Sequence, residues 1–193
     1  MPMVTRGELK SKAQSKGFTK AISESHLIKK AHEYTETKTY DIFISHSHLD
    51  ADEIYILSEE IEAMGFSVYV DWKEDNWLDR NKVTKEAAEK LRTKMKQCKS
   101  LFLITTDNSI QSRWCPWELG FFDGYKGKVA IMPVLGVLSA NESYNGVEYL
   151  GIYPYATIAR DTNNIETVMI NDSKDTYVTL KQWLSGYKPY KRR

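Results

Sequence analysis

The stretch Tyr40-Asp41-Ile42-Phe43-Ile44-Ser45 decides the fold class of this chain. It is a short apolar run that opens onto a polar segment, where Asp50 is placed to begin a helix as its N-cap. The helix that follows carries its apolar residues on one face and is closed by Gly65. A near-continuous apolar strand followed by an amphipathic helix is typical of a parallel sheet that helices cover on both faces.

The same alternation continues along the chain. We expect strands over 67–71, 101–105 and 129–134, one more strand within 149–158, and a closing helix over 176–184. A helix after Thr84 is expected to bury Ala87, Ala88, Leu91, Met95 and Cys98. The pattern predicts an α/β protein with a flavodoxin-like open parallel sheet and helices on both faces.

The sequence predicts that the chain consists of three segments. Residues 1–39 are expected to form an N-terminal helical extension, 40–187 the main domain, and 188–193 a solvated basic tail. In the extension, Thr5 and Glu8 have the spacing of a capping box, and Gly17 is placed to end the short helix. We expect this extension to pack on the main domain or on a neighbouring subunit.

Composition excludes several classes of protein. The 193 residues are 41% apolar and 27% charged, which suits one domain with an appendage. No apolar run approaches the roughly 18 residues of a membrane helix, and the start lacks a secretory signal, so we expect no membrane partner. Two cysteines cannot form a disulfide framework, which favours a cytoplasmic location.

Charge is unevenly distributed along the chain. Residues 1–40 carry eight Lys or Arg against four Asp or Glu, and residues 181–193 carry five against none. The middle therefore holds 14 basic and 22 acidic residues. An acidic body argues against a nucleic-acid partner.

The fold class predicts where a ligand would bind. In an open parallel sheet, ligands lie beyond the carboxyl ends of the strands, where the strand order reverses. With the strand order 2-1-3-4-5, this point lies between the first and third strands. The first strand ends at Ser45 and His46, the second ends at Asp71 and Trp72, and the third leads toward a helix with Glu118.

A second stretch, Ser112-Arg113-Trp114-Cys115-Pro116-Trp117-Glu118-Leu119, begins that helix. Together with 40–46 and the strand 65–71, it resembles three ordered motifs of Toll/interleukin-receptor (TIR) domains, over about residues 40–135. The chain most resembles the bacterial TIR proteins of Thoeris-like antiphage defence. The resemblance implies a TIR fold and an enzyme that cleaves NAD+ at the nicotinamide–ribose bond, with Glu118 as the essential carboxylate.

The residues suit this chemistry. Nicotinamide leaves NAD+ as a neutral molecule, so the reaction needs a carboxylate that stabilises a ribosyl cation rather than a general acid. Pro116 belongs in the first turn of a helix, which places Glu118 near the positive end of the helix dipole. On helix chemistry alone Glu118 is an exposed first-turn residue, and the resemblance favours the catalytic role. NAD+ is the substrate, and no metal or cofactor is expected. Candidate substrate-binding residues are Phe43, Ser45, His46, Asp71, Trp72, Trp77 and Trp114.

The loop Trp72–Val83 is long for a connection between a strand and a helix. It sets Trp72, Trp77 and Leu78 among charged residues, a composition typical of an interface anchor. We therefore expect self-association through this loop, and the alternative is a lid that closes on its own subunit.

Three functions stay open on this evidence. The first is an NAD+-consuming enzyme that releases an ADP-ribose-derived signalling nucleotide, cyclic or linear, which reaches a downstream effector. The second is a non-catalytic TIR interaction module. The third is an enzyme that resembles nucleoside deoxyribosyltransferases. Residues His46, His48 and Asp50 have an alternating spacing, but a polar loop between strand and helix explains them better than a metal site.

Overall fold

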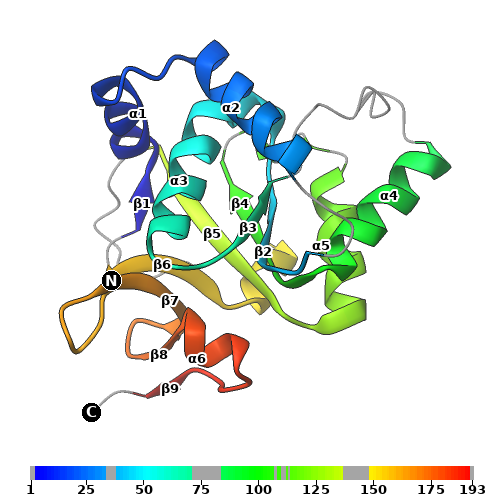
Figure 1. Ribbon diagram of the computed structural model, residues 1–193. Coiled ribbons are helices and arrows are strands. Elements are labelled where there is room, and N and C mark those ends of the chain that lie inside the picture. The colour runs from blue at the N-terminus through cyan, green and yellow to red at the C-terminus, as the bar shows by residue number, and fades with distance from the viewer. Residues whose placement is uncertain are drawn as a thin grey trace.

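A computed structural model of the chain describes residues 3–33, 38–70, 84–106, 108–109, 112, 114–136 and 148–191. Its centre is one twisted sheet in the order β3-β2-β4-β5-β6-β7-β8-β9 (Figure 1). The strands of this order are β3 (Val68–Val70), β2 (Tyr40–Ser45), β4 (Cys98–Thr105), β5 (Val129–Leu135), β6 (Tyr155–Arg160), β7 (Glu166–Ser173), β8 (Thr176–Thr179) and β9 (Tyr190–Lys191).

The first part of the sheet is parallel and has the predicted order. From β3 to β6 every neighbouring pair of strands is parallel. In chain order of these strands the arrangement is 2-1-3-4-5, so the reversal point lies between β2 and β4. The prediction of a flavodoxin-like α/β fold is confirmed, and the two strands that border the predicted site are neighbours.

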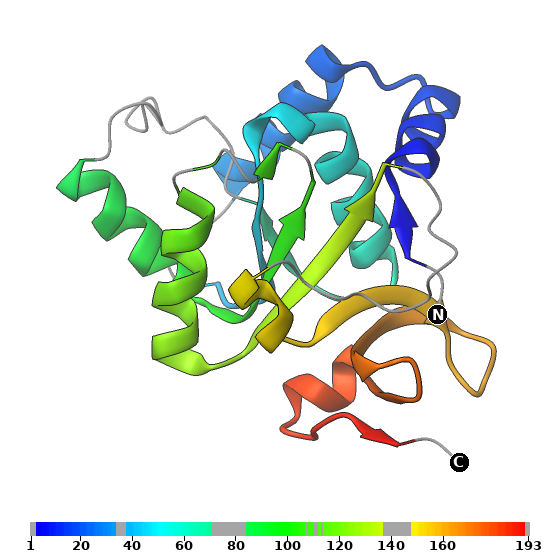
Figure 2. The same ribbon diagram turned by 180° about the vertical axis from the view of Figure 1, so that it is seen from behind.

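Alternate residues of β2 face two separate cores. Ile42 and Ile44 pack with α3 (Ala51–Ala63), whereas Phe43 packs with α4 (Lys85–Lys96) and α5 (Trp114–Lys126). Successive side chains of a strand point to opposite faces, which explains this division. Figure 2, from behind, shows α4 and α5 together on the face opposite α3.

The N-terminal extension belongs to the same core as α3. It consists of β1 (Val4–Thr5), α1 (Arg6–Ser15) and α2 (Lys20–Glu33). The predicted capping box at Thr5 is present, and Gly17 follows α1 with a φ of 74°. β1 pairs in parallel with the end of β5, and Leu9, Ala13 and Leu27 are buried in the core around α3. The extension was expected to pack on the main domain or on a neighbouring subunit, and in the structure it packs on the main domain.

The predicted breaks along the middle of the chain are mostly confirmed. Thr84 caps α4 through its side chain, and Gly65 follows α3 with a φ of 89°. Cys98 was expected on the helix but is the first residue of β4, because α4 ends at Lys96. Asp50 occupies the N-cap position of α3 but makes no capping hydrogen bond through its side chain.

The C-terminal quarter departs from the prediction. The expected closing helix over 176–184 is wrong in its first half, which is β8, and α6 spans only Leu180–Leu184. A 3₁₀ helix at Glu148–Ile152 precedes β6, and β6 forms an antiparallel hairpin with β7, which the sequence analysis did not predict. In the predicted basic tail, Lys188 and Lys191 are exposed, and Lys191 lies in β9, where it pairs with Thr176.

Candidate active site

A hydrogen bond joins two of the predicted site residues, Ser45 and Glu118. Ser45 Oγ donates a hydrogen bond of 2.5 Å to Glu118 Oε2. Ser45 is the last residue of β2, and Glu118 lies on α5, which covers the same face of the sheet. Both side chains are buried, with 1% and 3% of their surface exposed. The pair therefore sits beside the reversal point of the sheet, where the fold class predicts a ligand site.

Glu118 is not the exposed first-turn residue that helix chemistry alone suggested. α5 begins at Trp114, so Pro116 lies in the first turn as predicted, but Glu118 lies one residue beyond that turn. The field of the helix dipole falls off within the first turn. The hydroxyl of Ser45 therefore stabilises the carboxylate more directly than the helix dipole does.

Two of the predicted aromatic residues, Trp114 and Phe43, are buried in the core between the sheet and α5. Trp114 is 4% exposed and makes an edge-to-face contact of 5.4 Å with Trp117. Its indole Nε1 has no hydrogen-bond partner in the part of the chain that the structure describes. Phe43 is fully buried and stacks on Tyr69, with ring centroids 5.4 Å apart. Phe43 thus lies in the packing two residues before Ser45, and a contact with substrate stays a prediction for both rings.

Of the four remaining predicted residues, the structure describes only His46. His46 is buried directly after β2, and its Nδ1 lies 3.3 Å from the carbonyl oxygen of Ile44. Asp71, Trp72 and Trp77 lie outside the described residues, together with the loop to Val83. Their roles in substrate binding and self-association stay predictions.

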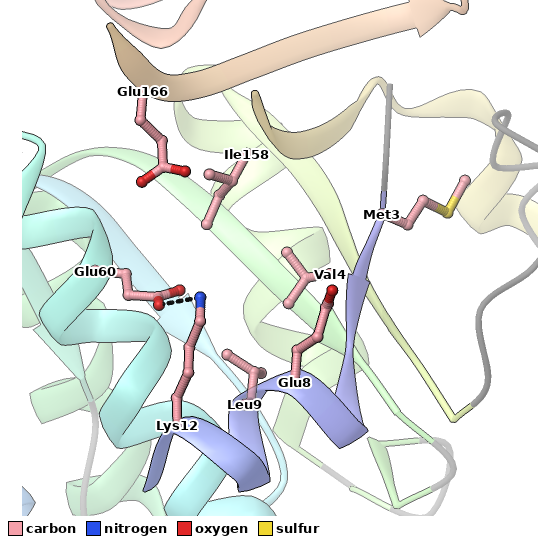
Figure 3. Close-up of a pocket in the computed structure, with 8 residues that line it drawn as sticks. All are labelled: Met3, Val4, Glu8, Leu9, Lys12, Glu60, Ile158 and Glu166. Atoms are coloured by element: carbon pink, nitrogen blue, oxygen red, sulfur yellow. Dashed lines mark hydrogen bonds and ion pairs between the residues drawn. The ribbon is translucent and has the colours of Figure 1, made fainter. Parts of the chain in front are cut away.

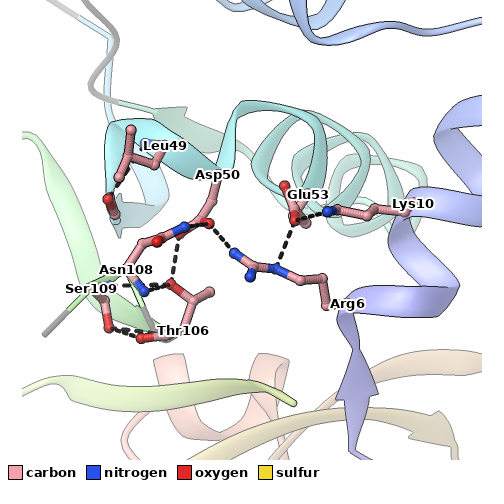
Figure 4. A network of polar contacts seen from close by, with 9 residues as sticks. Arg6, Lys10, Leu49, Asp50, Glu53, Thr106, Asn108 and Ser109 are labelled. Atoms are coloured by element: carbon pink, nitrogen blue, oxygen red, sulfur yellow. Dashed lines mark hydrogen bonds and ion pairs between the residues drawn. The ribbon is translucent and has the colours of Figure 1, made fainter. Parts of the chain in front are cut away.

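A polar network that the sequence pattern did not predict lies at the same edge of the sheet, on the segments that follow β2 and β4. Asp50 is buried, and its Oδ1 accepts hydrogen bonds from Arg6 and, at 2.6 Å, from Asn108 Nδ2 (Figure 4). Its Oδ2 accepts a hydrogen bond of 2.6 Å from Thr106 Oγ1. The position of Thr106 directly after β4 was a usable signal, but Arg6 lies 44 residues before Asp50 and gives none.

Comparisons with known proteins assign this chain to a family. The family model described as TIR domain matches residues 42–166. This range includes the segments that follow β2 and β4 and the helix that carries Glu118. The chain belongs to the TIR domain family. It is 49% identical over 179 residues to a Bacillus cereus (strain MSX-D12) protein named probable 3' cyclic ADP-D-ribose synthase ThsB', and the match covers 91% of each chain.

A second relative shares a shorter segment with this TIR protein. The putative cyclic ADP-D-ribose synthase TIR2 of Cytobacillus dafuensis is 34% identical over 85 residues. That match covers 44% of this chain and 22% of the relative.

Other features of the TIR domain do not compete with the Ser45–Glu118 pair as a candidate site. A pocket of about 180 Å³ between α1, α3, β6 and β7 is lined by none of the predicted residues (Figure 3). Lys12 in this pocket is already paired with Glu60. Among the described residues, no three His, Cys, Asp or Glu side chains gather as metal ligands would. No helix in that same part of the chain is long and apolar enough to cross a membrane.

Proposed function

We propose that this TIR protein cleaves the nicotinamide–ribose bond of NAD+ and releases an ADP-ribose-derived signalling nucleotide in antiphage defence. The observation that carries the proposal is the buried Ser45–Glu118 hydrogen bond at the reversal point of the sheet. The relative that matches 91% of this chain is named a cyclic ADP-D-ribose synthase, which supports a cyclic product.

The chemistry assigns one role to each member of the pair. Departure of neutral nicotinamide leaves positive charge on the ribosyl carbon, and the carboxylate of Glu118 stabilises that charge. Ser45 fixes the orientation of the carboxylate by donating to Oε2. The indole N–H of Trp114 is a buried donor without a described partner, and its ring shields the cation from water. A ribosyl cation shielded from water is captured by a nucleophile of its own molecule, which yields a ring.

The alternative functions receive less support. An interaction module has no need of a carboxylate buried between a strand end and a helix, where ionised groups are costly unless they are hydrogen-bonded. A preference for deoxynucleosides receives no support from either relative, since both are named cyclic ADP-D-ribose synthases.

Four finer parts of the proposal concern the assembly of the enzyme, its downstream partner, its cofactors and its location. Self-association through the Trp72–Val83 loop completes the site, and the nucleotide product acts on a downstream effector. The reaction uses NAD+ as substrate with no metal or other cofactor. Both cysteines are free and buried, which supports a location in the reducing cytoplasm.

Incubation of the purified protein with NAD+, followed by mass spectrometry, tests this function. We expect nicotinamide and a cyclic product lighter than ADP-ribose by one water, and no turnover of deoxynucleosides. Glu118→Gln keeps the size of the side chain but removes its charge, and should lower the rate about 10²–10³-fold. Intact NAD+ with the wild type, or wild-type turnover by a folded Glu118→Gln variant, would overturn the proposal.

A further inference from the structure

Arg6 joins the N-terminal extension to buried carboxylates at the carboxyl edge of the sheet, and Lys10 of the same helix lies beside it, with its Nζ 3.8 Å from Glu53 Oε1. Thr5 pairs with Leu135 at the end of β5 and also caps α1, so the backbone of Arg6 is fixed at this edge. The guanidinium Nη2 donates to Asp50 Oδ1, and Nε lies 2.8 Å from Glu53 Oε1. Arg6 therefore lies between two buried carboxylates of the main domain, as Figure 4 shows.

Asp50 joins the two loops that border the site. Its own loop follows β2, and its backbone N–H donates to the carbonyl of Ser47 at 3.1 Å. Its carboxylate accepts from Thr106 and Asn108, which follow β4. With Arg6, the carboxylate thus receives donors from the extension and from the second loop at once. One buried side chain, 1% exposed, therefore sets the distance between these loops.

One loop follows Ser45, and the other precedes the helix that carries Glu118. The first loop begins at Ser45, five residues before Asp50. In the second loop, Ser109 Oγ accepts from the N–H of Thr106 at 3.0 Å, and the N–H of Ser112 donates to the carbonyl of Ser109 at 3.1 Å. Ser112 Oγ then accepts from the N–H of Cys115 in the first turn of α5, at 3.3 Å.

Arginine is the residue type that this junction needs. Its planar guanidinium can lie between two carboxylates at once, here with a hydrogen bond to Asp50 and an ion pair with Glu53, whereas a lysine ammonium is a point charge. Without the guanidinium, Asp50 would lose one of its donors, and Glu53 would keep the more distant ammonium of Lys10, 3.8 Å from its Oε1. We infer that Arg6 is a positioning residue for NAD+ cleavage: through Asp50 it holds the loops that bring Ser45 and Glu118 together. This inference rests on the proposed function.

Steady-state kinetics of Arg6→Met and Arg6→Lys test the inference against a matched control, Lys12→Met. Lys12 also joins α1 to α3, by its ion pair with Glu60, but does not contact the network of Asp50. We expect Arg6→Met to lower kcat about 10- to 100-fold, because small displacements of reacting groups are costly, with a smaller change in KM. Arg6→Lys should lie between wild type and Arg6→Met, and Lys12→Met should keep kcat within about twofold.

A double-mutant cycle shows whether Arg6 acts through Asp50. The variant Arg6→Met/Asp50→Asn removes both charges, so it remains informative if Arg6→Met alone does not fold. If Arg6 works through Asp50, the double variant should have a kcat no lower than that of Asp50→Asn. Losses that add independently, or a kcat for Arg6→Met equal to that of Lys12→Met, would overturn the inference.

Amide hydrogen exchange measures how well the backbone N–H groups of the two loops are protected. It needs no NAD+ turnover, so its result is separate from the proposed function. The N–H groups of Asp50 and Ser109 are both hydrogen-bonded within their loops, to Ser47 and Thr106. Arg6→Met should speed their exchange, and Lys12→Met should not. Unchanged exchange in Arg6→Met would contradict the inference even if the wild type consumes NAD+. A wild type that leaves NAD+ intact would overturn the proposed function, and faster exchange in Arg6→Met would then still show that Arg6 holds the loops.

Discussion

Ser45 Oγ donates to Glu118 Oε2 at 2.5 Å, although the two residues are 73 positions apart in the chain. The bond exists because β2 and β4 are neighbours and α5 returns over the face that Phe43 and Ser45 share. A hydrogen bond from a neutral donor to a carboxylate is short and about twice as strong as one between neutral groups. Ser45 therefore supports the Glu118 carboxylate directly.

Ser45→Ala should therefore lower kcat without unfolding the protein. Loss of one hydrogen bond to a charged group costs about 1.5–3 kcal/mol, which corresponds to a loss of about 10- to 100-fold in rate if the bond is needed in the transition state. The rate of nicotinamide release measures this effect. Ser58→Ala is the matched control, since Ser58 is also buried but donates to the carbonyl of Tyr55 on α3. Equal rates of nicotinamide release by Ser45→Ala and Ser58→Ala would show that Ser45 has no role in the reaction.

Trp114 is predicted to shield the ribosyl cation. Because Trp114 is buried, a substitution that tests this role must preserve the packing of the core. Trp114→Ala would leave a cavity that costs about 3–5 kcal/mol, so a lost activity could reflect lost folding. Trp114→Phe keeps most of the packing and removes the indole N–H. We expect a lower ratio of cyclic to hydrolysed product from Trp114→Phe, measured by chromatography of the products. Trp117→Phe is the control, and the same product ratio in both would assign Trp114 to packing alone.

Local patterns were sufficient for the parallel part of the fold. The strand at Tyr40, the helix closed by Gly65 and the cap at Thr84 follow from residues within a few positions of one another. The predicted helix over 176–184 failed because two kinds of structure meet at Thr179. The capping box of Thr179 with Gln182 marks the true start of α6 and was the available signal.

The candidate site was predictable to a different degree for each residue. Ser45 follows from the strand order, since the carboxyl ends of parallel strands meet at one edge. The catalytic role of Glu118 was predicted from the family motif, because the helix pattern alone predicts an exposed residue at this position. Arg6 was not predictable, since its partner Asp50 lies 44 residues away and looked like an ordinary helix cap. Contacts over such distances in sequence are set by the packing of α1 on α3, which no local pattern encodes.

Asp41 secures the opposite end of β2 and makes the stability of the fold depend on pH. Its carboxylate accepts from Lys99 Nζ at 2.8 Å and from the N–H of Ser67 at 2.8 Å. Burial raises the pKa of Asp41, but the hydrogen bonds from Lys99 and Ser67 outweigh burial and hold the pKa below its ordinary value of 3.8. A lowered pKa in the folded state stabilises the fold above pH 3.8, and this stabilisation is lost as the pH falls through the folded-state pKa.

Asp41→Asn should accordingly be less stable than the wild type at pH 7, by about 1 kcal/mol because the ion pair is partly exposed. Urea unfolding at several pH values measures the difference, which should shrink as the pH falls below 3.8. Lys99→Met removes only the ion pair and should cost less than Asp41→Asn. A difference in stability between wild type and Asp41→Asn that stays constant down to pH 2 would contradict this account.

Assembly through the Trp72–Val83 loop gives the last prediction. The sequence of the loop sets Trp72 and Trp77 among charged residues, and aromatic anchors within a charged rim commonly carry binding energy. If the site is completed by a second subunit, specific activity rises with protein concentration, because mass action governs assembly. Trp77→Ala should lower both self-association, measured by sedimentation, and NAD+ cleavage, with the melting temperature nearly unchanged. Tyr187→Ala is the control, since Tyr187 is an exposed aromatic residue near the C-terminus. A constant specific activity in a monomeric protein across a wide dilution series would favour a lid within one subunit.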